Sequence, residues 1–177
     1  AVGTVIGFPH GTTSTAAKVA ETRQAAADGA SEFDMVVNIG ALRSGFDDVV
    51  RDDIRAVVEA AGGAVTKVIL EVSLLDDEQI ERGSRLAEEA GADFVKTSTG
   101  FAGGGATVET VSLMRRTVGP DTQVKASGGV RSLQDAIAML DAGATRLGTS
   151  GSATILGELR RIAAGGTASG AVDESSY

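Results

Sequence analysis

Short apolar runs alternate with longer amphipathic segments along almost the whole chain, and this order restricts the fold more than any other feature. Short apolar runs predict buried strands, and segments with apolar residues three or four positions apart predict helices. The expected strands are residues 2–8, 33–38, 65–72, 94–96, 123–126 and 146–148. The expected helices are residues 12–28, 46–61, 76–90, 107–118, 132–141 and 152–164. Six strand-helix units with short connections indicate a parallel α/β domain.

Two parallel folds are compatible with this order: an open doubly wound sheet and a (β/α)₈ barrel. Several loops that follow strands carry reactive or phosphate-binding residue types, and a barrel collects all such loops at one face. An open sheet concentrates its chemistry at one switch point instead. We therefore expect a (β/α)₈ TIM barrel, with six units present and the first two strand-helix units absent. Residues 1–164 form the partial barrel catalytic domain in this interpretation, and residues 165–177 form a flexible C-terminal tail.

The composition excludes several classes of function. The formal net charge is −8, so a basic surface for nucleic acid or an anionic membrane is not expected. The chain has no cysteine, which leaves neither a disulfide framework nor a thiol nucleophile. No spacing of residues resembles a metal-binding cluster, and no apolar run is long enough to span a membrane. We expect a cytoplasmic protein without a metal or cofactor.

Ionisable residues are expected on one face of four successive strands. Side chains alternate along a strand, and the more apolar set should face the helices. The other set then points into the barrel, and it includes Asp34, Lys67, Glu71, Lys96 and Lys125. Buried charges are paired or functional. A purely structural ion-pair network remains open, but five converging groups favour a chemical role.

A pair of lysines gives the sharper signal. Lys96 ends one buried strand before a Thr/Ser/Gly loop, and Lys125 lies in the next strand, about 4.8 Å away. Two ammonium groups this close lower one pKa, which a nucleophilic amine requires because an unperturbed lysine has a pKa of about 10.4. The implied chemistry is a Schiff base with a carbonyl compound. Asp34 is placed to carry protons, and Asn38 and Glu71 are expected to help position the substrate.

Glycine-rich loops follow the last two expected strands. Gly128 and Gly129 lie in one loop, and Gly148, Ser150 and Gly151 lie in the other, just before a helix. Paired loops at this place in a barrel form a recurring phosphate site, because glycines let backbone amides approach the anion. The run of glycines at 103–105 is expected to be an ordinary flexible loop.

Four sequence motifs resemble the 2-deoxyribose-5-phosphate aldolase family. They are Gly-Phe-Pro-His-Gly at 7–11, Phe-Asp-Met-Val at 33–36, Phe-Val-Lys-Thr-Ser-Thr-Gly-Phe at 94–101 and Val-Lys-Ala-Ser-Gly-Gly-Val-Arg at 124–131. The resemblance runs from about residue 2 to residue 156. It implies a metal-independent class I aldolase that cleaves 2-deoxy-D-ribose 5-phosphate to D-glyceraldehyde 3-phosphate and acetaldehyde.

The resemblance also implies roles for individual residues. Lys96 matches the Schiff-base lysine, Lys125 the lysine that lowers its pKa, and Asp34 the proton-relay aspartate. The residues that match phosphate-binding positions are Gly100, Gly128, Gly129, Gly148 and Ser150. Gly151 stands where some members have a second serine, which puts one phosphate hydrogen bond in doubt. The implied partners are a sugar phosphate and acetaldehyde, and a homo-oligomer is compatible with the resemblance.

Alternatives to this interpretation remain open. Another sugar-phosphate Schiff-base aldolase would share Lys96 and the phosphate loops, whereas a non-catalytic sugar-phosphate-binding barrel would form no covalent adduct. Tyr177, the last residue, has two interpretations: a proton donor to the enamine, as the tyrosine that ends some family members suggests, or a chain end without a role.

The expected lack of two units leads to a prediction about the stability and activity of residues 1–177. Six units cannot close an eight-stranded barrel, so the first and last strands would expose their edges and interior faces. Uncovered apolar surface costs about 25 cal/mol per Å², and a few hundred Å² would consume most of a stability of about 5–15 kcal/mol. We expect residues 1–177 expressed alone to be inactive and to aggregate or fold loosely, and an added upstream segment to restore activity. A monodisperse, cooperatively melting and active protein would contradict this.

Overall fold

The computed structural model describes residues 1–165 and contains one six-stranded parallel sheet. The strands are β1 (Gly3–Ile6), β2 (Glu32–Val36), β3 (Val65–Ile69), β4 (Phe94–Lys96), β5 (Gln123–Ser127) and β6 (Arg146–Gly148). They lie side by side in sequence order, and every pairing is parallel. A doubly wound sheet would reverse its order at a switch point, so that alternative is wrong. The six strands form a half-barrel.

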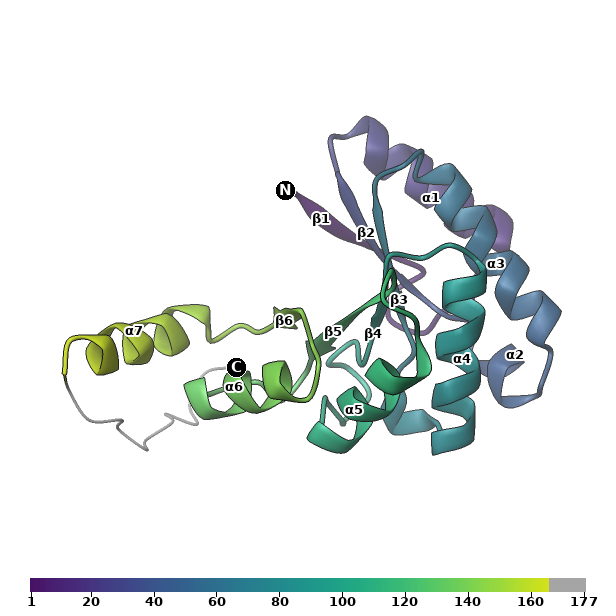
Figure 1. Cartoon of the computed structure of the whole chain (residues 1–177). Coiled ribbons are helices and arrows are strands. Elements are labelled where there is room, and N and C mark those ends of the chain that lie inside the picture. The colour runs from purple at the N-terminus through teal and green to yellow at the C-terminus, as the bar shows by residue number, and fades with distance from the viewer. Residues whose placement is uncertain (166–177) are drawn as a thin grey trace.

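Helices cover one face of the half-barrel. They are α1 (Thr15–Ala27), α2 (Ile39–Arg43), α3 (Asp47–Ala60), α4 (Asp77–Glu89), α5 (Val108–Thr117), α6 (Leu133–Asp141) and α7 (Ser152–Ala163). Among the longer helices, α1, α3, α4, α5, α6 and α7 contact one another in that order along the outside of the sheet (Figure 1). None of the helices in the described part of the chain is long and apolar enough to cross a membrane.

Local sequence explains where most helices begin. Ser14 accepts a hydrogen bond from the backbone N–H of Ala17 and caps α1, as its residue type predicts. The helices α4, α5 and α6 begin with reciprocal capping boxes, in which the cap side chain and the third helical residue satisfy each other's backbone N–H groups. Two short elements were not expected from the sequence: α2 and a single 3₁₀ turn, η1 (Val72–Leu74).

The hydrophobic core lies between the sheet and the helices. One set of alternating strand residues belongs to it, including Phe33, Met35, Val68, Val95 and Val124, which are all fully buried. The predicted alternation is therefore confirmed, and the other set of side chains faces the inside of the half-barrel.

A buried ion pair lies on the helix side of β2. Lys18 on α1 is fully buried, and its Nζ lies 2.6 Å from Oδ2 of Asp53 on α3 and 3.0 Å from the carbonyl oxygen of Val36. The other Asp53 oxygen accepts a hydrogen bond of 2.7 Å from the hydroxyl of Thr15. This one-to-one ion pair ties two helices to the C-terminal end of β2, and it was not predicted from the sequence.

We predict that Lys18→Met destabilises the protein by about 3–5 kcal/mol, because it leaves the Asp53 carboxylate buried without its cation. Urea unfolding followed by circular dichroism measures the loss. The matched control is Arg55→Met on α3, which removes a partly exposed partner 3.2 Å from the exposed Asp52 and should cost less than about 1 kcal/mol. Equal losses of unfolding free energy in the two variants would show that the buried pair stabilises the protein no more than an exposed pair does.

Candidate active site

The carboxylate of Asp34 is the meeting point of three lysine side chains. Its Oδ2 accepts hydrogen bonds from Lys96 at 2.8 Å and from Lys125 at 2.7 Å. Its Oδ1 lies 2.9 Å from Nζ of Lys67. Lys96 and Lys125 are register partners on β4 and β5, and Asp34 and Lys67 are register partners on β2 and β3. The structure thus brings together four of the five side chains that strand alternation predicts on this face.

Two further charged residues complete this group and were missed from the sequence. Glu32 accepts a hydrogen bond of 2.6 Å from Lys67 and another hydrogen bond from Arg146 on β6. The cations of Lys67 and Arg146 also lie 5.9 and 5.1 Å from the centroid of the Phe94 ring. We call the six charged residues the Asp34 cluster: Glu32, Asp34, Lys67, Lys96, Lys125 and Arg146. Glu32 lies two residues before Asp34 in β2, so the two side chains point to the same face. The strand predicted from the sequence began at residue 33 and therefore did not include Glu32.

The pKa values of the cluster are set by opposing effects. Burial alone would raise the pKa of Asp34, but the charge on Lys96 and the hydrogen bonds from Lys125, Lys96 and Lys67 hold it well below its usual range. Burial lowers the pKa of Lys96; the ion pair with Asp34 opposes that effect, and the charges on Lys125 and Lys67 add to it. The net result is a Lys96 amine with a lowered pKa beside an ionised carboxylate.

Glu71, the fifth residue expected on the interior face, and Asn38, which was expected to help position the substrate, both lie outside the Asp34 cluster because their strands end earlier than predicted. β3 ends at Ile69, and Glu71 bonds to the backbone N–H of Thr99 at 3.2 Å and to its hydroxyl instead of joining the Asp34 cluster. β2 ends at Val36, and the Asn38 side chain caps α2 by accepting a hydrogen bond from Ala41 N–H at 3.0 Å. The strand alternation does not continue through such turns.

The glycine loops after β5 and β6 lie against each other. Gly128 and Gly129 have left-handed φ values of 80° and 82°. The Thr149 hydroxyl donates a hydrogen bond of 2.7 Å to the carbonyl of Val130, which ties the second loop to the first. The cap residue of α7 is Gly151, and no side chain caps the first amides of that helix. Backbone amides at such a helix N-terminus suit an anion.

The residues predicted to bind phosphate differ in their exposure to solvent. Gly100, Gly129 and Ser150 are exposed, whereas Gly128, Gly148 and Gly151 are partly covered. A side chain at Gly148 would lie only 2.8 Å from the Cβ of Ser127 on β5, so the two strands need a glycine there.

The glycine run at 103–105 is not an ordinary loop. A Cβ on Gly105 would lie 2.4 Å from the carbonyl oxygen of Gly128, and one on Gly104 would lie 2.5 Å from the Cβ of Ser73. Ala106 N–H also donates to the carbonyl oxygen of Gly128, at 2.9 Å. The loop after β4 is therefore packed onto the loop after β5, and the glycines permit that close approach.

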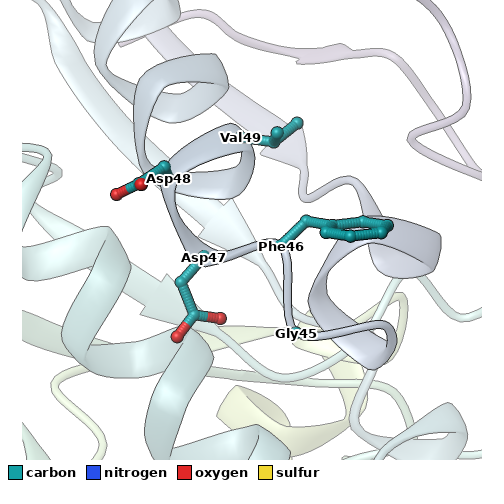
Figure 2. Close-up of a pocket in the computed structure, with 5 residues that line it drawn as sticks. All are labelled: Gly45, Phe46, Asp47, Asp48 and Val49. Carbon is teal, nitrogen blue, oxygen red and sulfur yellow. The ribbon is translucent and has the colours of Figure 1, made fainter.

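A surface depression at the turn between α2 and α3 is separate from these groups (Figure 2). It is lined by residues 45–49, with Phe46 and Val49 exposed and with Asp47 lying 3.2 Å from Nε of Arg82 on α4. None of its residues belongs to the Asp34 cluster, and acidic residues in the first turn of α3 are accounted for by the helix dipole. Its lining offers no chemistry that competes with Lys96.

Other expectations concern metals and the chain end. In residues 1–165, no group of three or more His, Cys, Asp or Glu side chains is arranged to hold a metal ion. Tyr177 and nearly all of the expected tail at 165–177 lie outside the described residues. The proposed role of Tyr177 stays a prediction.

Comparison with known proteins gives a consistent result. The family model of the DeoC/LacD family aldolases matches residues 1–169. Deoxyribose-phosphate aldolase 1 of Oceanobacillus iheyensis is 62% identical over 159 residues, which cover 89% of this chain and 72% of that protein. The tetrameric deoxyribose phosphate aldolase of Aeropyrum pernix is 36% identical with a TM-score of 0.82, over 90% of this chain and 68% of that one.

A crystal structure from Coccidioides immitis, proposed to be a deoxyribose-phosphate aldolase, is 49% identical with a TM-score of 0.88. The alignment covers 90% of this chain and 64% of that one, so this chain spans less than two thirds of that structure. Both the sequence and the arrangement of strands and helices agree with these relatives. The chain belongs to the DeoC/LacD family of aldolases.

Proposed function

We propose that the protein is a deoxyribose-phosphate aldolase that works through a Schiff base on Lys96. The observation that carries the proposal is the geometry of Lys96. Its amine is buried with 8% of the residue exposed, has a lowered pKa, and lies 2.8 Å from the ionised carboxylate of Asp34. A family model for aldolases and relatives named deoxyribose-phosphate aldolases support the same activity.

The reaction begins with the free amine of Lys96. Its nitrogen attacks the C1 aldehyde of open-chain 2-deoxyribose 5-phosphate, and the carbinolamine loses water to give an iminium ion. The C3 hydroxyl then loses its proton while the electrons of the C2–C3 bond move into the iminium. This step releases D-glyceraldehyde 3-phosphate and leaves a two-carbon enamine on Lys96. Protonation at C2 and hydrolysis by water release acetaldehyde and restore the amine.

Asp34 is proposed to carry the protons in these steps, directly or through water. Its Oδ2 contacts both Lys96 and Lys125, so it lies close enough to exchange protons at the Lys96 nitrogen as the amine is converted to the iminium. The hydrogen bond from Lys67 to Oδ1 holds the carboxylate in this orientation. Lys125 is proposed to keep the pKa of Lys96 low, because a second positive charge disfavours an ammonium group beside it.

The glycine loops are proposed to bind the phosphate of the substrate. The residues involved are Gly100, Gly128, Gly129, Gly148, Ser150 and Gly151. Two observations support this proposal: the loops after β5 and β6 contact each other, and the N-terminus of α7 beside them has no side-chain cap.

We also propose that the half-barrel belongs to a complete (β/α)₈ barrel. Within residues 1–165, β1 and β6 each pair with one neighbouring strand. The ion pair from Glu32 on β2 to Arg146 on β6 crosses the inner face and supports the curvature that a barrel needs. A homo-oligomer and a cytoplasmic location are further proposals. The tetramer from Aeropyrum pernix supports the first, and a phosphorylated sugar substrate supports the second.

The first prediction of this proposal is a covalent adduct. In the complete protein, acetaldehyde with borohydride should add a reduced two-carbon group to Lys96 alone, because burial and the neighbouring charges of Lys125 and Lys67 lower the pKa of its amine. Peptide mass mapping locates the adduct, and Lys67 and Lys125 serve as internal controls. A non-catalytic binder would give no adduct, and another aldolase would prefer a different donor aldehyde. An adduct elsewhere would refute the assignment.

The second prediction concerns the pH dependence of adduct formation. Only the unprotonated amine of Lys96 reacts, so a lower pKa gives more reactive amine at a given pH. Lys125→Leu removes a positive charge and leaves Oδ2 of Asp34 to Lys96 alone, and both changes raise the pKa of Lys96. The pH midpoint of Schiff-base formation should rise by about one unit or more.

The matched control for this variant is Lys125→Arg, which keeps the charge and should leave the midpoint near its original value. Rates of adduct formation measured from about pH 5 to pH 10 give both midpoints. A slower reaction with an unchanged midpoint in Lys125→Leu would mean that Lys125 positions the substrate only.

A further inference from the structure

Glu71 is an acidic residue that the mechanism above does not use, and its local structure is unfavourable in two respects. It is the only residue other than glycine in the described chain with a left-handed φ, 59°, which a bulky side chain rarely adopts. It is also 1% exposed, and its Oε1 has no hydrogen-bond partner among the described residues. Backbone strain of this kind clusters at functional sites, and a buried polar atom without a partner calls for an explanation.

The other oxygen of Glu71 holds the loop that follows Lys96. Oε2 accepts a hydrogen bond from the Thr99 backbone N–H at 3.2 Å and another from the Thr99 hydroxyl. The hydroxyl in turn accepts a hydrogen bond of 3.0 Å from the N–H of Phe101. A hydroxyl has one proton, so its donation to Glu71 leaves its lone pairs free for Phe101. One carboxylate oxygen therefore fixes both residues that flank Gly100.

This turn contacts the loop that follows β1. Phe101 is 74% exposed, and its ring meets the ring of Phe8 edge-on, with 5.3 Å between centroids. Phe8 lies in the loop after β1, whereas Phe101 lies in the loop after β4, so the contact bridges two strands that are separated by β2 and β3. The position of the turn therefore determines both where the Gly100 backbone lies and whether the two rings meet.

We propose that Glu71 is a positioning residue that holds the Thr99-Gly100-Phe101 turn for the phosphorylated end of the substrate. The inference rests on the proposed aldolase function. Glu71 belongs to a different hydrogen-bond network from the Asp34 cluster, so it acts on substrate recognition and leaves the reactivity of Lys96 unchanged. The left-handed backbone at Glu71 is what turns its carboxylate from the end of β3 toward Thr99.

Loss of Glu71 should affect the two reactions of Lys96 differently: cleavage of the sugar phosphate and adduct formation with acetaldehyde. Glu71→Ala and Glu71→Gly should each raise the KM for 2-deoxyribose 5-phosphate at least tenfold, with kcat within about threefold of the original value. Adduct formation between Lys96 and acetaldehyde, which has no phosphate, should stay within twofold. Glu71→Gln keeps one acceptor oxygen and should recover most of the loss. Glu59→Ala, which removes an exposed acid from α3, is the matched control for net charge and should change neither quantity.

The pair of glycine and alanine variants distinguishes positioning from a loss of folding stability. Glycine adopts the left-handed conformation freely and alanine does not, so Glu71→Gly should melt at a higher temperature than Glu71→Ala. A positioning role predicts equal KM increases in the two variants in spite of this difference. A KM increase that follows the melting temperature would show a merely structural role and overturn the proposal.

Hydrogen exchange tests the turn without reference to activity. In Glu71→Ala the backbone amides of Thr99 and Phe101 should exchange at least tenfold faster, whereas the strand amide of Val95 should exchange at its original rate. Unchanged exchange at Thr99 and Phe101, an unchanged KM, or an acetaldehyde adduct reduced as strongly as sugar-phosphate cleavage would each refute the proposal. A complete wild-type protein, with the expected upstream segment, that forms no adduct would instead refute the aldolase function.

Discussion

The arrangement of the site depends on one carboxylate that is shared by three ammonium groups. Asp34 contacts Lys67 through Oδ1 and both Lys96 and Lys125 through Oδ2, so it links side chains from β2, β3, β4 and β5. Without it, the buried cations of Lys67 and Lys96 and the partly buried cation of Lys125 would repel one another. The lysines in turn hold the pKa of Asp34 far below its usual range, so the carboxylate is ionised at neutral pH.

The Asp34 cluster contains more positive than negative charges, and this excess favours the unprotonated, reactive amine of Lys96. Four cationic side chains meet two carboxylates, and Glu32 is already occupied by Lys67 and Arg146. Lys96 and Lys125 must therefore share one oxygen of Asp34. A fully paired Lys96 would be a stable ammonium ion and a poor nucleophile. Burial and an excess of positive charge oppose that pairing, and the pKa of Lys96 falls as a result.

The sequence predicts what depends on one strand or on neighbouring strands, and it fails where the chain turns or where distant strands meet. Alternation placed Asp34, Lys67, Lys96 and Lys125 on one face, because that pattern needs only the period of a strand. The contact of Glu32 with Arg146 joins β2 to β6, and no local pattern specifies how far a sheet curves. Glu71 was misplaced because the alternation was carried past the end of β3, where a left-handed residue redirects the chain.

Two buried ionic groups flank β2, and their difference shows how one fold separates stability from reactivity. On the helix side, Lys18 has its own carboxylate, Asp53, and a carbonyl at the end of the strand. That pairing satisfies the cation and holds α1 and α3 against the strand. On the inner side, two residues earlier in the same strand, Asp34 is divided among three cations. The outer pair therefore anchors the end of β2 through the carbonyl of Val36. On the inner face two carboxylates serve four cations, and this excess of positive charge helps to lower the pKa of Lys96, the lysine proposed to react.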